Sequence, residues 1–384
     1  DTENELVRKL TSIANDVSVK IKTDEYGAFL EVINWEEVRD YLEKVTEKLK
    51  VELKDVPNYK EIIALSLYEV MEGTPFYLYH YWADENYFPD TNKLDSSAIS
   101  NLFAAIGRDE KRRFDFMEKW AQHINPDKAL FFDISSISSY STNIDFIEWG
   151  YNRDKENLPQ INLGMVFCED KKLPVNYCLY PGSIVDVTTL KNCKKYLTNF
   201  GLNDFLFILD RGFFSTANVL EMNDKDCCIS FIQPLPFSLK KAKRNIRNIN
   251  SSLSRSGYYI LATNKTGMSH EEVLTHYRNK DLVEKVFDVL KNEMDGKRLR
   301  THNDHTTTGK LFVMFISLVI YYEIIRVMNQ NKLFKTYTIK ELLYELRKIK
   351  INHIAKDGKP IVSEVSKKQK TIFNPTGKST FVNG

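Results

Sequence analysis

The sequence predicts an α/β fold, in which a mixed sheet is flanked by helices and preceded by a helical N-terminal domain. Three observations predict it. Apolar residues recur at helical spacing through residues 1–126. From residue 127 the chain changes to short β-rich runs bounded by turn residues. Helical periodicity returns at residue 277, after a small basic, loop-rich and partly β insertion at 217–276.

Two helices are predicted at the end of the N-terminal domain. The segments DSSAISNLFAAIG and RDEKRRFDFMEKWAQHI follow one another with a turn that contains Gly107. This arrangement is compatible with a DNA-binding helix-turn-helix, although many helical hairpins share it. The aromatic stretch TPFYLYHYWADENYFPD just before them is predicted to serve in packing.

Four strands are predicted in the next part of the chain, within KALFFDIS, LPQINLGMVFCED, LPVNYCLYPG and DFLFILDRG. The second and third are joined by EDKK and read as a hairpin. Between the third and fourth, VDVTTLKNCKKYLTNFG reads as a helix that ends at Gly201. Three strands, a helix and a fourth strand predict a mixed sheet with helices on its faces. A capping box, Ser269-x-x-Glu272, then begins the next helix.

The predicted boundaries divide the chain into five parts. They are a helical, DNA-binding N-terminal domain at 1–126, the first part of the α/β core at 127–216, the basic insertion at 217–276, the second part of the core at 277–330, and a basic C-terminal region at 331–384. The last region holds 12 basic and 4 acidic residues, on a chain whose formal net charge is +2. Basic segments on a nearly neutral chain fit a polyanionic partner, although a run of lysines is most often a solvated face.

The chain has the composition of an ordinary globular protein of 384 residues. Its five cysteines form no CxxC pair, so we expect reduced core thiols rather than a zinc site: Cys168, Cys178, Cys193, Cys227 and Cys228. No signal-peptide pattern opens the sequence. The segment LFVMFISLVIYYEII at 311–325 is short for a membrane span and predicts a buried core helix instead. We therefore expect a cytoplasmic protein without a membrane partner.

The stretch YRNKDLVEKVFDVLK at 277–291 reads as a helix that is apolar around most of its circumference. At about 100° per residue, one narrow line of charged and polar residues lies within roughly 40° of Glu284. Its members are Tyr277, Lys280, Glu284, Asp288 and Lys291. Such a line either faces water or directs one carboxylate and two cations at a shared site.

Two aspartates follow apolar runs and bear on that choice. Asp133 follows ALFF and Asp210 follows FLFIL, which places each at the edge of a buried sheet. A lone carboxylate is costly to bury there, so it needs a cation, a helix cap or a metal. Taken singly, Asp133 fits a cap of the Ser-rich turn and Asp210 fits an Asp-Arg-Gly turn. Together with Glu284 they make a set of three carboxylates suited to Mg²⁺ or Mn²⁺, and two such ions support phosphoryl displacement.

These motifs resemble the DDE transposases of bacterial insertion sequences, which have an RNase H-like catalytic core. The nearest group carries its third carboxylate in a Tyr-x2-Arg-x3-Glu-x6-Lys signature. Here that signature falls on Tyr277, Lys280, Glu284 and Lys291, with every spacing kept. Further resemblance lies in DISSISSYS, GYNRDKENLPQINLG, YPGSIVDVTTL and ILDRGFFS, so that it covers residues 127 to about 325.

The resemblance implies a cut-and-paste enzyme that uses two Mg²⁺ or Mn²⁺ ions held by Asp133, Asp210 and Glu284. It would nick DNA at the ends of its own element and transfer the 3′-hydroxyl to target DNA, as a homodimer in a synaptic complex, near the nucleoid of a bacterium or archaeon. The residues expected to contact DNA are Tyr277, Lys280, Lys291, Arg211, Arg153, Lys240, Lys241, Lys243, Arg244 and Arg247.

Two features depart from the group. Lys280 stands where Arg is usual, so a point charge replaces a bidentate fork. The insertion is short, and the last tryptophan of the chain is Trp149, before it. Relatives that form a DNA hairpin stack a flipped base on an aromatic residue of the insertion. The aromatic residues that could substitute are Phe231, Phe237, Tyr258 and Tyr259.

Other functions remain open at this stage. An RNase H-like nuclease without strand transfer would need the same three carboxylates. A domesticated DNA-binding protein that no longer cuts would be expected to have lost one of them, yet all are present. A helical scaffold, whose carboxylates serve only in caps and salt bridges, is the remaining alternative.

Overall fold

The computed structural model describes residues 53–85, 92, 94–126, 129–223, 229–236, 260–346, 351–352 and 361–362. The described residues fall into two compact units, which divide at Arg112/Arg113 and at Thr307/Thr308. Residues 113–307 form the unit that contains the sheet, and the described residues before and after them belong to the other.

The sheet has six strands in the order β3-β2-β1-β4-β5-β6. Their bounds are β1 Ala129–Ser138, β2 Gln160–Cys168, β3 Leu173–Pro181, β4 Leu206–Leu209, β5 Ser230–Pro234 and β6 Leu261–Thr263. The first three strands pair antiparallel, β4 runs parallel to both β1 and β5, and β6 is antiparallel to β5. This is a mixed sheet within an α/β arrangement of strands and helices, so the predicted α/β class is confirmed.

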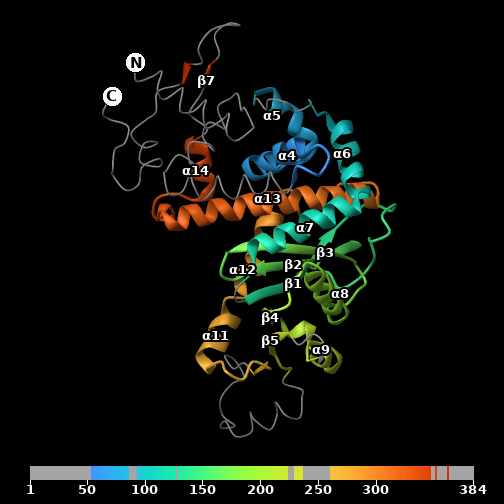
Figure 1. The fold of residues 1–384 in the computed structure, drawn as a ribbon. Coiled ribbons are helices and arrows are strands. Elements are labelled where there is room, and N and C mark those ends of the chain that lie inside the picture. The colour runs from blue at the N-terminus through green and yellow to red at the C-terminus, as the bar shows by residue number, and fades with distance from the viewer. Residues whose placement is uncertain are drawn as a thin grey trace, which may run out of the picture. The chain divides into compact units, whose positions relative to one another are not determined.

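Helices flank this sheet (Figure 1). The helices of the same unit are α8 Asp186–Asn199, α9 Thr216–Met222, α11 His270–Arg278, α12 Asp281–Asp288 and α7 Glu110–Ile124, whose first residues lie before the division at Arg112/Arg113. This unit also has a 3-10 turn at Arg211–Phe213 and a π-helical turn at Val289–Glu293. The helix predicted between the third and fourth strands is α8, and Gly201 follows it with a φ of +81°. The capping box is present: Ser269 Oγ accepts from the Glu272 backbone, and Glu272 Oε2 accepts from the Ser269 backbone.

The centre of the sheet is built from the continuous apolar runs of the sequence. Phe131 and Phe132 of β1 and Phe207 of β4 are fully buried. The rings of Phe132 and Phe207 stack with centroids 5.8 Å apart, and Phe213 packs on Phe132 at 5.1 Å. Burial on both faces explains why these strands read as unbroken apolar runs rather than as alternating ones.

The predicted insertion at 217–276 contributes to the same sheet. It holds most of α9, strands β5 and β6, and most of α11. Its most basic part, 237–259, lies outside the described residues, and so do the predicted DNA contacts there: Lys240, Lys241, Lys243, Arg244 and Arg247.

The other unit is mostly helical. Its helices are α4 Tyr59–Glu72, α5 Tyr79–Glu85, α6 Ser96–Arg108, α14 Ile339–Leu346 and α13 Asp304–Gln330, whose first residues lie before the division at Thr307/Thr308. It also has 3-10 turns at Phe76–Leu78 and Leu333–Lys335 and a two-stranded sheet of β7 Ile351–Asn352 and β8 Ile361–Val362. The two helices predicted at the end of the N-terminal domain are α6 and α7, separated by Asp109. Part of the aromatic stretch serves in packing as predicted, because Tyr68 of α4 contacts the rings of Phe76, Tyr79 and Trp82. Tyr77 and Tyr81 of the same stretch are exposed.

Helix α13 contains the long apolar segment. It is long and apolar enough to cross a membrane, yet 83% of its most apolar 18-residue window is buried inside the protein, as expected of the predicted core helix. The described cysteines, Cys168, Cys178 and Cys193, are buried free thiols, while Cys227 and Cys228 lie outside the described residues.

One buried carboxylate in α13 predicts a pH-dependent stability. Glu323 is buried with Arg326 Nη1 at 3.5 Å from its Oε1, and its Oε2 has no hydrogen-bond partner among the described residues. Burial raises the pKa of Glu323 to about 8. In the unfolded chain a Glu titrates at about pH 4.3, so folding takes up a proton between these two values and stability falls as pH rises through that window.

We therefore expect Glu323→Gln to raise the free energy of unfolding by about 1–3 kcal/mol at pH 8.5 and to change it little at pH 5. Urea denaturation at both pH values measures this. Asp204→Asn, at an exposed position, is the matched control and should show no such pH dependence. An equal effect of Glu323→Gln at both pH values would contradict a proton bound to Glu323.

Candidate active site

Asp133 and Asp210 come together because of the register of two parallel strands. The ladder between β1 and β4 ends at the pair Phe132 and Leu209. The next residue after Phe132 is Asp133, and the next residue after Leu209 is Asp210. These two aspartates therefore lie side by side, at the spacing of neighbouring strands of about 4.8 Å. The expectation that β1 ends near Asp133 is wrong, since β1 continues to Ser138 paired with β2 alone. The pairing between β4 and β1 ends just before Asp133.

Glu284 reaches this edge of the sheet from α12. The helix packs against β1 and β2, and it buries Val283, Val286 and Phe287. Glu284 itself is exposed. One side of α12 is therefore fixed by the core, and the third carboxylate of the predicted set lies on its solvent side.

The buried ammonium of Lys280 connects the three carboxylates. Its Nζ donates to Glu284 Oε1 at 2.6 Å and lies 4.0 Å from Asp210 Oδ1. It also interacts electrostatically with Asp133. Lys280 was expected to contact a DNA phosphate; in this structure it is a buried counter-ion for the candidate metal ligands.

Burial and the charges of these groups shift the pKa values of Asp133 and Lys280. Burial raises the pKa of Asp133 to about 6, against the opposing effects of Lys280 and of the Ile134 backbone N–H, which donates to Asp133 Oδ1 at 2.9 Å. The neighbouring Asp210 raises it further. Burial alone would lower the pKa of Lys280, but Asp133, Glu284 and Asp210 together raise it above its ordinary value. Asp133 therefore lies where more positive charge would be favourable.

The prediction of one unbroken helix over 277–291 is wrong. Helix α11 ends at Arg278, a turn at Asn279 and Lys280 follows, and α12 begins at Asp281. The Lys280 N–H bonds the Tyr277 carbonyl, three residues back, so the turn is tighter than an α-helix. Tyr277 accordingly lies on a different helix from Glu284.

A carboxylate outside the predicted set holds this helix junction in place. Glu169 is buried in the turn between β2 and β3. Its Oε2 lies 2.5 Å from His276 Nδ1, and its Oε1 accepts from Asn279 Nδ2 at 2.7 Å. His276 lies just before the turn that carries Lys280, and Asn279 is part of that turn. The sequence signal for Glu169 was weak, because it stands in the polar EDKK turn of a hairpin.

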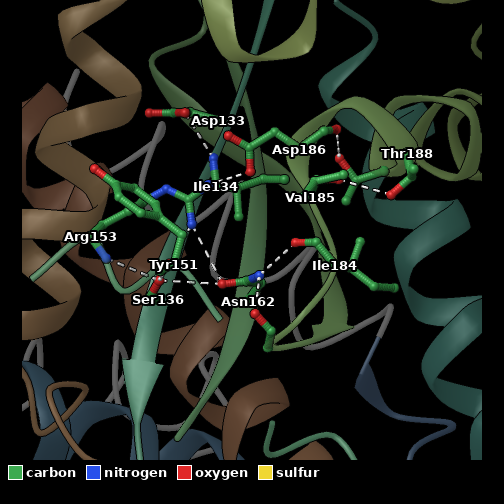
Figure 2. A network of polar contacts seen from close by, with 12 residues as sticks. Asp133, Ile134, Ser136, Tyr151, Arg153, Asn162, Ile184, Val185, Asp186 and Thr188 are labelled. Atoms are coloured by element: carbon green, nitrogen blue, oxygen red, sulfur yellow. Dashed lines mark hydrogen bonds and ion pairs between the residues drawn. The ribbon is translucent and has the colours of Figure 1, made fainter. Parts of the chain in front are cut away.

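Lys291 and Arg153, both expected at phosphates, are held by protein carboxylates in the structure. Lys291 lies in the π-helical turn, and its Nζ contacts Asp154 Oδ2 at 2.7 Å and Ser135 Oγ at 2.8 Å. Arg153 pairs through Nη2 with Asp186, the first residue of α8 (Figure 2). Each cation would have to share these partners with a phosphate or exchange them for one.

The network around Arg153 includes residues that were not among the predicted site residues. Asn162, buried in β2, accepts from Arg153 Nη1 at 3.5 Å and donates to the Ile184 carbonyl at 3.0 Å (Figure 2). Ser136 Oγ also accepts from Arg153 Nη1, at 3.3 Å. Polar residues inside an otherwise apolar strand were the available signal, since a buried amide must find partners.

The structure places the remaining predicted residues as follows. Arg211 is exposed on the 3-10 turn directly after Asp210, Tyr277 is partly buried on α11, and Asp288 is exposed. Of the aromatic residues considered for stacking on a flipped base, Phe231 is buried in β5. The other three, Phe237, Tyr258 and Tyr259, lie outside the described residues.

The donor set suits a hard divalent cation, because all its groups are carboxylates and Asp133 and Asp210 repel one another. Among the described residues, no three His, Cys, Asp or Glu side chains already stand close enough together to hold one metal ion. The Lys280 ammonium provides the positive charge in this arrangement, so Glu284 would have to leave Lys280 to complete a three-carboxylate site.

Comparison with known proteins finds a matching family. The family model described as the transposase DDE domain matches residues 125–320. Among solved structures, the chain is similar to piggyBac transposase in a synaptic complex with hairpin DNA, with a TM-score of 0.44 and 11% sequence identity over 76% of this chain and 70% of that one. No curated protein matches the chain.

The family match spans more than half of the chain. The protein belongs to the DDE transposase family, whose members generally use divalent metal ions.

The Glu169 contacts predict a local stability effect. Glu169→Ala would leave His276 and Asn279 without their acceptors, so we expect the free energy of unfolding to fall by about 1–3 kcal/mol. Glu169→Gln keeps one acceptor oxygen and should lose less. Thermal and urea unfolding measure both variants against Glu271→Ala, an exposed residue of α11. Equal stability of Glu169→Ala and Glu271→Ala would show that the junction does not depend on Glu169.

Proposed function

We propose that the protein is a cut-and-paste DNA transposase that nicks DNA at the ends of its element and transfers the freed 3′-hydroxyl to target DNA. One observation carries the proposal: β1, β4 and α12 bring Asp133, Asp210 and Glu284 around the single ammonium of Lys280. Three carboxylates of this kind on this fold are typical of metal-dependent phosphoryl transfer.

Asp133, Asp210 and Glu284 would hold two Mg²⁺ or Mn²⁺ ions. When bound, such ions stabilise the charge on the attacking and leaving oxygens of a phosphodiester. Asp133 and Asp210 stand on a rigid sheet edge, whereas Glu284 is the exposed member, and its hydrogen bond to Lys280 is the contact to be exchanged. The register therefore fixes two ligands, and α12 supplies the third.

Lys280 would keep the three carboxylates from repelling one another in the absence of metal. Once Glu284 turns away, the ammonium is released toward the neighbouring DNA backbone, which reconciles its burial here with the phosphate contact expected from the sequence. Arg211 and Lys291 would contact phosphates on either side of it, as positioning contacts without base specificity.

The partners follow from the reaction. Transposon-end DNA and target DNA would both lie at this edge of the sheet, and cutting two ends together calls for a homodimer in a synaptic complex. The basic run KKAKRNIR, outside the described residues, would contact the transposon end, and the helices α6 and α7 would add DNA binding. Such a protein would work in the cytoplasm, beside the nucleoid.

Glu284→Gln tests the assignment, because it keeps the size of the side chain and removes the charge that a metal needs. We expect nicking of supercoiled plasmid that carries the element's ends to fall by at least about 100-fold in Mg²⁺ or Mn²⁺, with DNA binding retained. Glu293→Gln, in the following turn and partly exposed, is the control and should nick normally.

The products of the same assay separate the alternatives. A joined product with target DNA supports transposase, and nicked DNA without any joined product supports a nuclease on the same core. DNA binding by the intact protein without cleavage would indicate a domesticated DNA-binding protein. Undiminished cleavage by Glu284→Gln would contradict the three-carboxylate site.

A further inference from the structure

Large aromatic side chains lie exposed on the segment that follows β1. Tyr140, Trp149 and Tyr151 have exposed fractions of 76%, 64% and 81%. Elsewhere the described tryptophans are buried, with Trp82 at 6% and Trp120 at 0%. Exposing rings of this size costs favourable burial, so several together mark an interaction site rather than a part of the core.

The backbone that carries Trp149 and Tyr151 is fixed. Glu148 and the buried Gln160 form a pair of backbone hydrogen bonds of 3.0 Å each. Gly150 is packed so closely that an added Cβ would lie 2.0 Å from the Gly182 carbonyl oxygen. Gln160 Nε2 then donates to the Tyr151 carbonyl at 2.8 Å. The two rings therefore project from a rigid support, which lowers the entropy lost when they bind a partner.

The same segment adjoins the candidate active site. The Tyr151 carbonyl accepts from Ser136 Oγ at 3.4 Å, three residues along β1 from Asp133. Arg153, two residues after Tyr151, interacts electrostatically with Asp133. Figure 2 shows the ring of Tyr151 pointing out of the polar network on the side where Arg153 and Asp133 lie.

The surroundings of these rings indicate which partner they suit. Charged groups of both signs lie beside them: Arg153 and the exposed Lys155 follow Tyr151, while Glu148 and Asp154 belong to the same segment. Arg298, whose guanidinium lies 5.9 Å from the centre of the Tyr140 ring, pairs with Glu156. The centre of a protein–protein interface is usually depleted of charge. Exposed rings beside a site for a DNA backbone are instead typical of surfaces that stack unpaired nucleotides.

We propose that Trp149 and Tyr151 form a base-stacking site for unpaired DNA nucleotides beside the cleaved phosphate. The proposal rests on the proposed function and adds a subsite to it. A strand that has been nicked, or a target opened for joining, presents bases that are free to leave the helix. Stacking on a ring accepts any base, because every base has a π face, so the site would hold the strand without reading its sequence.

The test uses the full chain with two fluorescent duplexes of identical sequence, one blunt and one with a three-nucleotide single-stranded overhang. We expect the intact protein to bind the overhang duplex about tenfold more tightly than the blunt one. Trp149→Leu and Tyr151→Leu should each remove most of that preference, while Trp149→Phe and Tyr151→Phe should keep it. The salt dependence should stay unchanged in all four, because stacking releases no counterions.

Tyr344→Leu is the matched control, since Tyr344 is also exposed, at 57%, but lies on α14 in the other unit. It should bind both duplexes as the intact protein does. An overhang preference that survives in both Trp149→Leu and Tyr151→Leu would overturn the stacking site.

Two further measurements separate this proposal from its alternatives. A change of oligomeric mass in Trp149→Leu without DNA, seen by light scattering, would assign the rings to a second copy of the chain and overturn the DNA site. Plasmid nicking by the intact protein tests the proposed function separately. Normal nicking together with an unchanged overhang preference in the leucine variants rejects only the stacking site, whereas absent nicking by the intact protein rejects the function on which it rests.

Discussion

The arrangement of the site depends on one interaction, the balance between the buried ammonium of Lys280 and the carboxylates of Asp133, Asp210 and Glu284. Carboxylates at the edge of a buried sheet are stable only when a cation offsets their charge. Even with Lys280 present, burial and Asp210 keep the pKa of Asp133 at about 6. One positive charge therefore offsets only part of the negative charge of the three carboxylates. Additional positive charge would be favourable there, and divalent cations would supply it.

Two separate features of the fold place these charged groups together. The parallel register of β1 and β4 places Asp133 beside Asp210 without requiring any other contact. The break between α11 and α12 places Lys280 at the start of the helix that carries Glu284, and Glu169 fixes the break from the β2–β3 turn. Two polar side chains buried in β2 hold the segment that follows β1. Asn162 accepts from Arg153 Nη1 (Figure 2), and Gln160 Nε2 donates to the Tyr151 carbonyl.

Much of the core could be predicted from the sequence because its signals are local. Apolar runs gave the strands of the sheet, Gly201 gave the end of α8, and the Ser269 capping box gave the start of α11. Asp133 and Asp210 could be identified because a carboxylate directly after a long apolar run is costly to bury and so needs a partner. The meeting of Asp133 with Asp210 could be hypothesised from the three acidic positions and the family resemblance, but not from either apolar run alone, since strand register depends on partners far away in sequence.

Other features could not be read from periodicity. The turn at Asn279 and Lys280 keeps right-handed helical dihedral angles, so the apolar pattern continues across it although the hydrogen bonding changes. The ion pairs of Arg153 with Asp186 and of Lys291 with Asp154 join residues that are far apart in sequence or lie in irregular segments. The exposure of Trp149 and Tyr151 was equally hidden, because large aromatic residues are usually expected in a core.

The most direct test of the central claim is to locate the metal. Crystals of the protein soaked in Mn²⁺ would be measured at a wavelength where manganese scatters anomalously. The account predicts anomalous density within about 2.2 Å of carboxylate oxygens of both Asp133 and Asp210, with Glu284 turned away from Lys280 toward the ion. Density found only elsewhere, with the Lys280–Glu284 hydrogen bond intact in a protein that cleaves DNA, would contradict it.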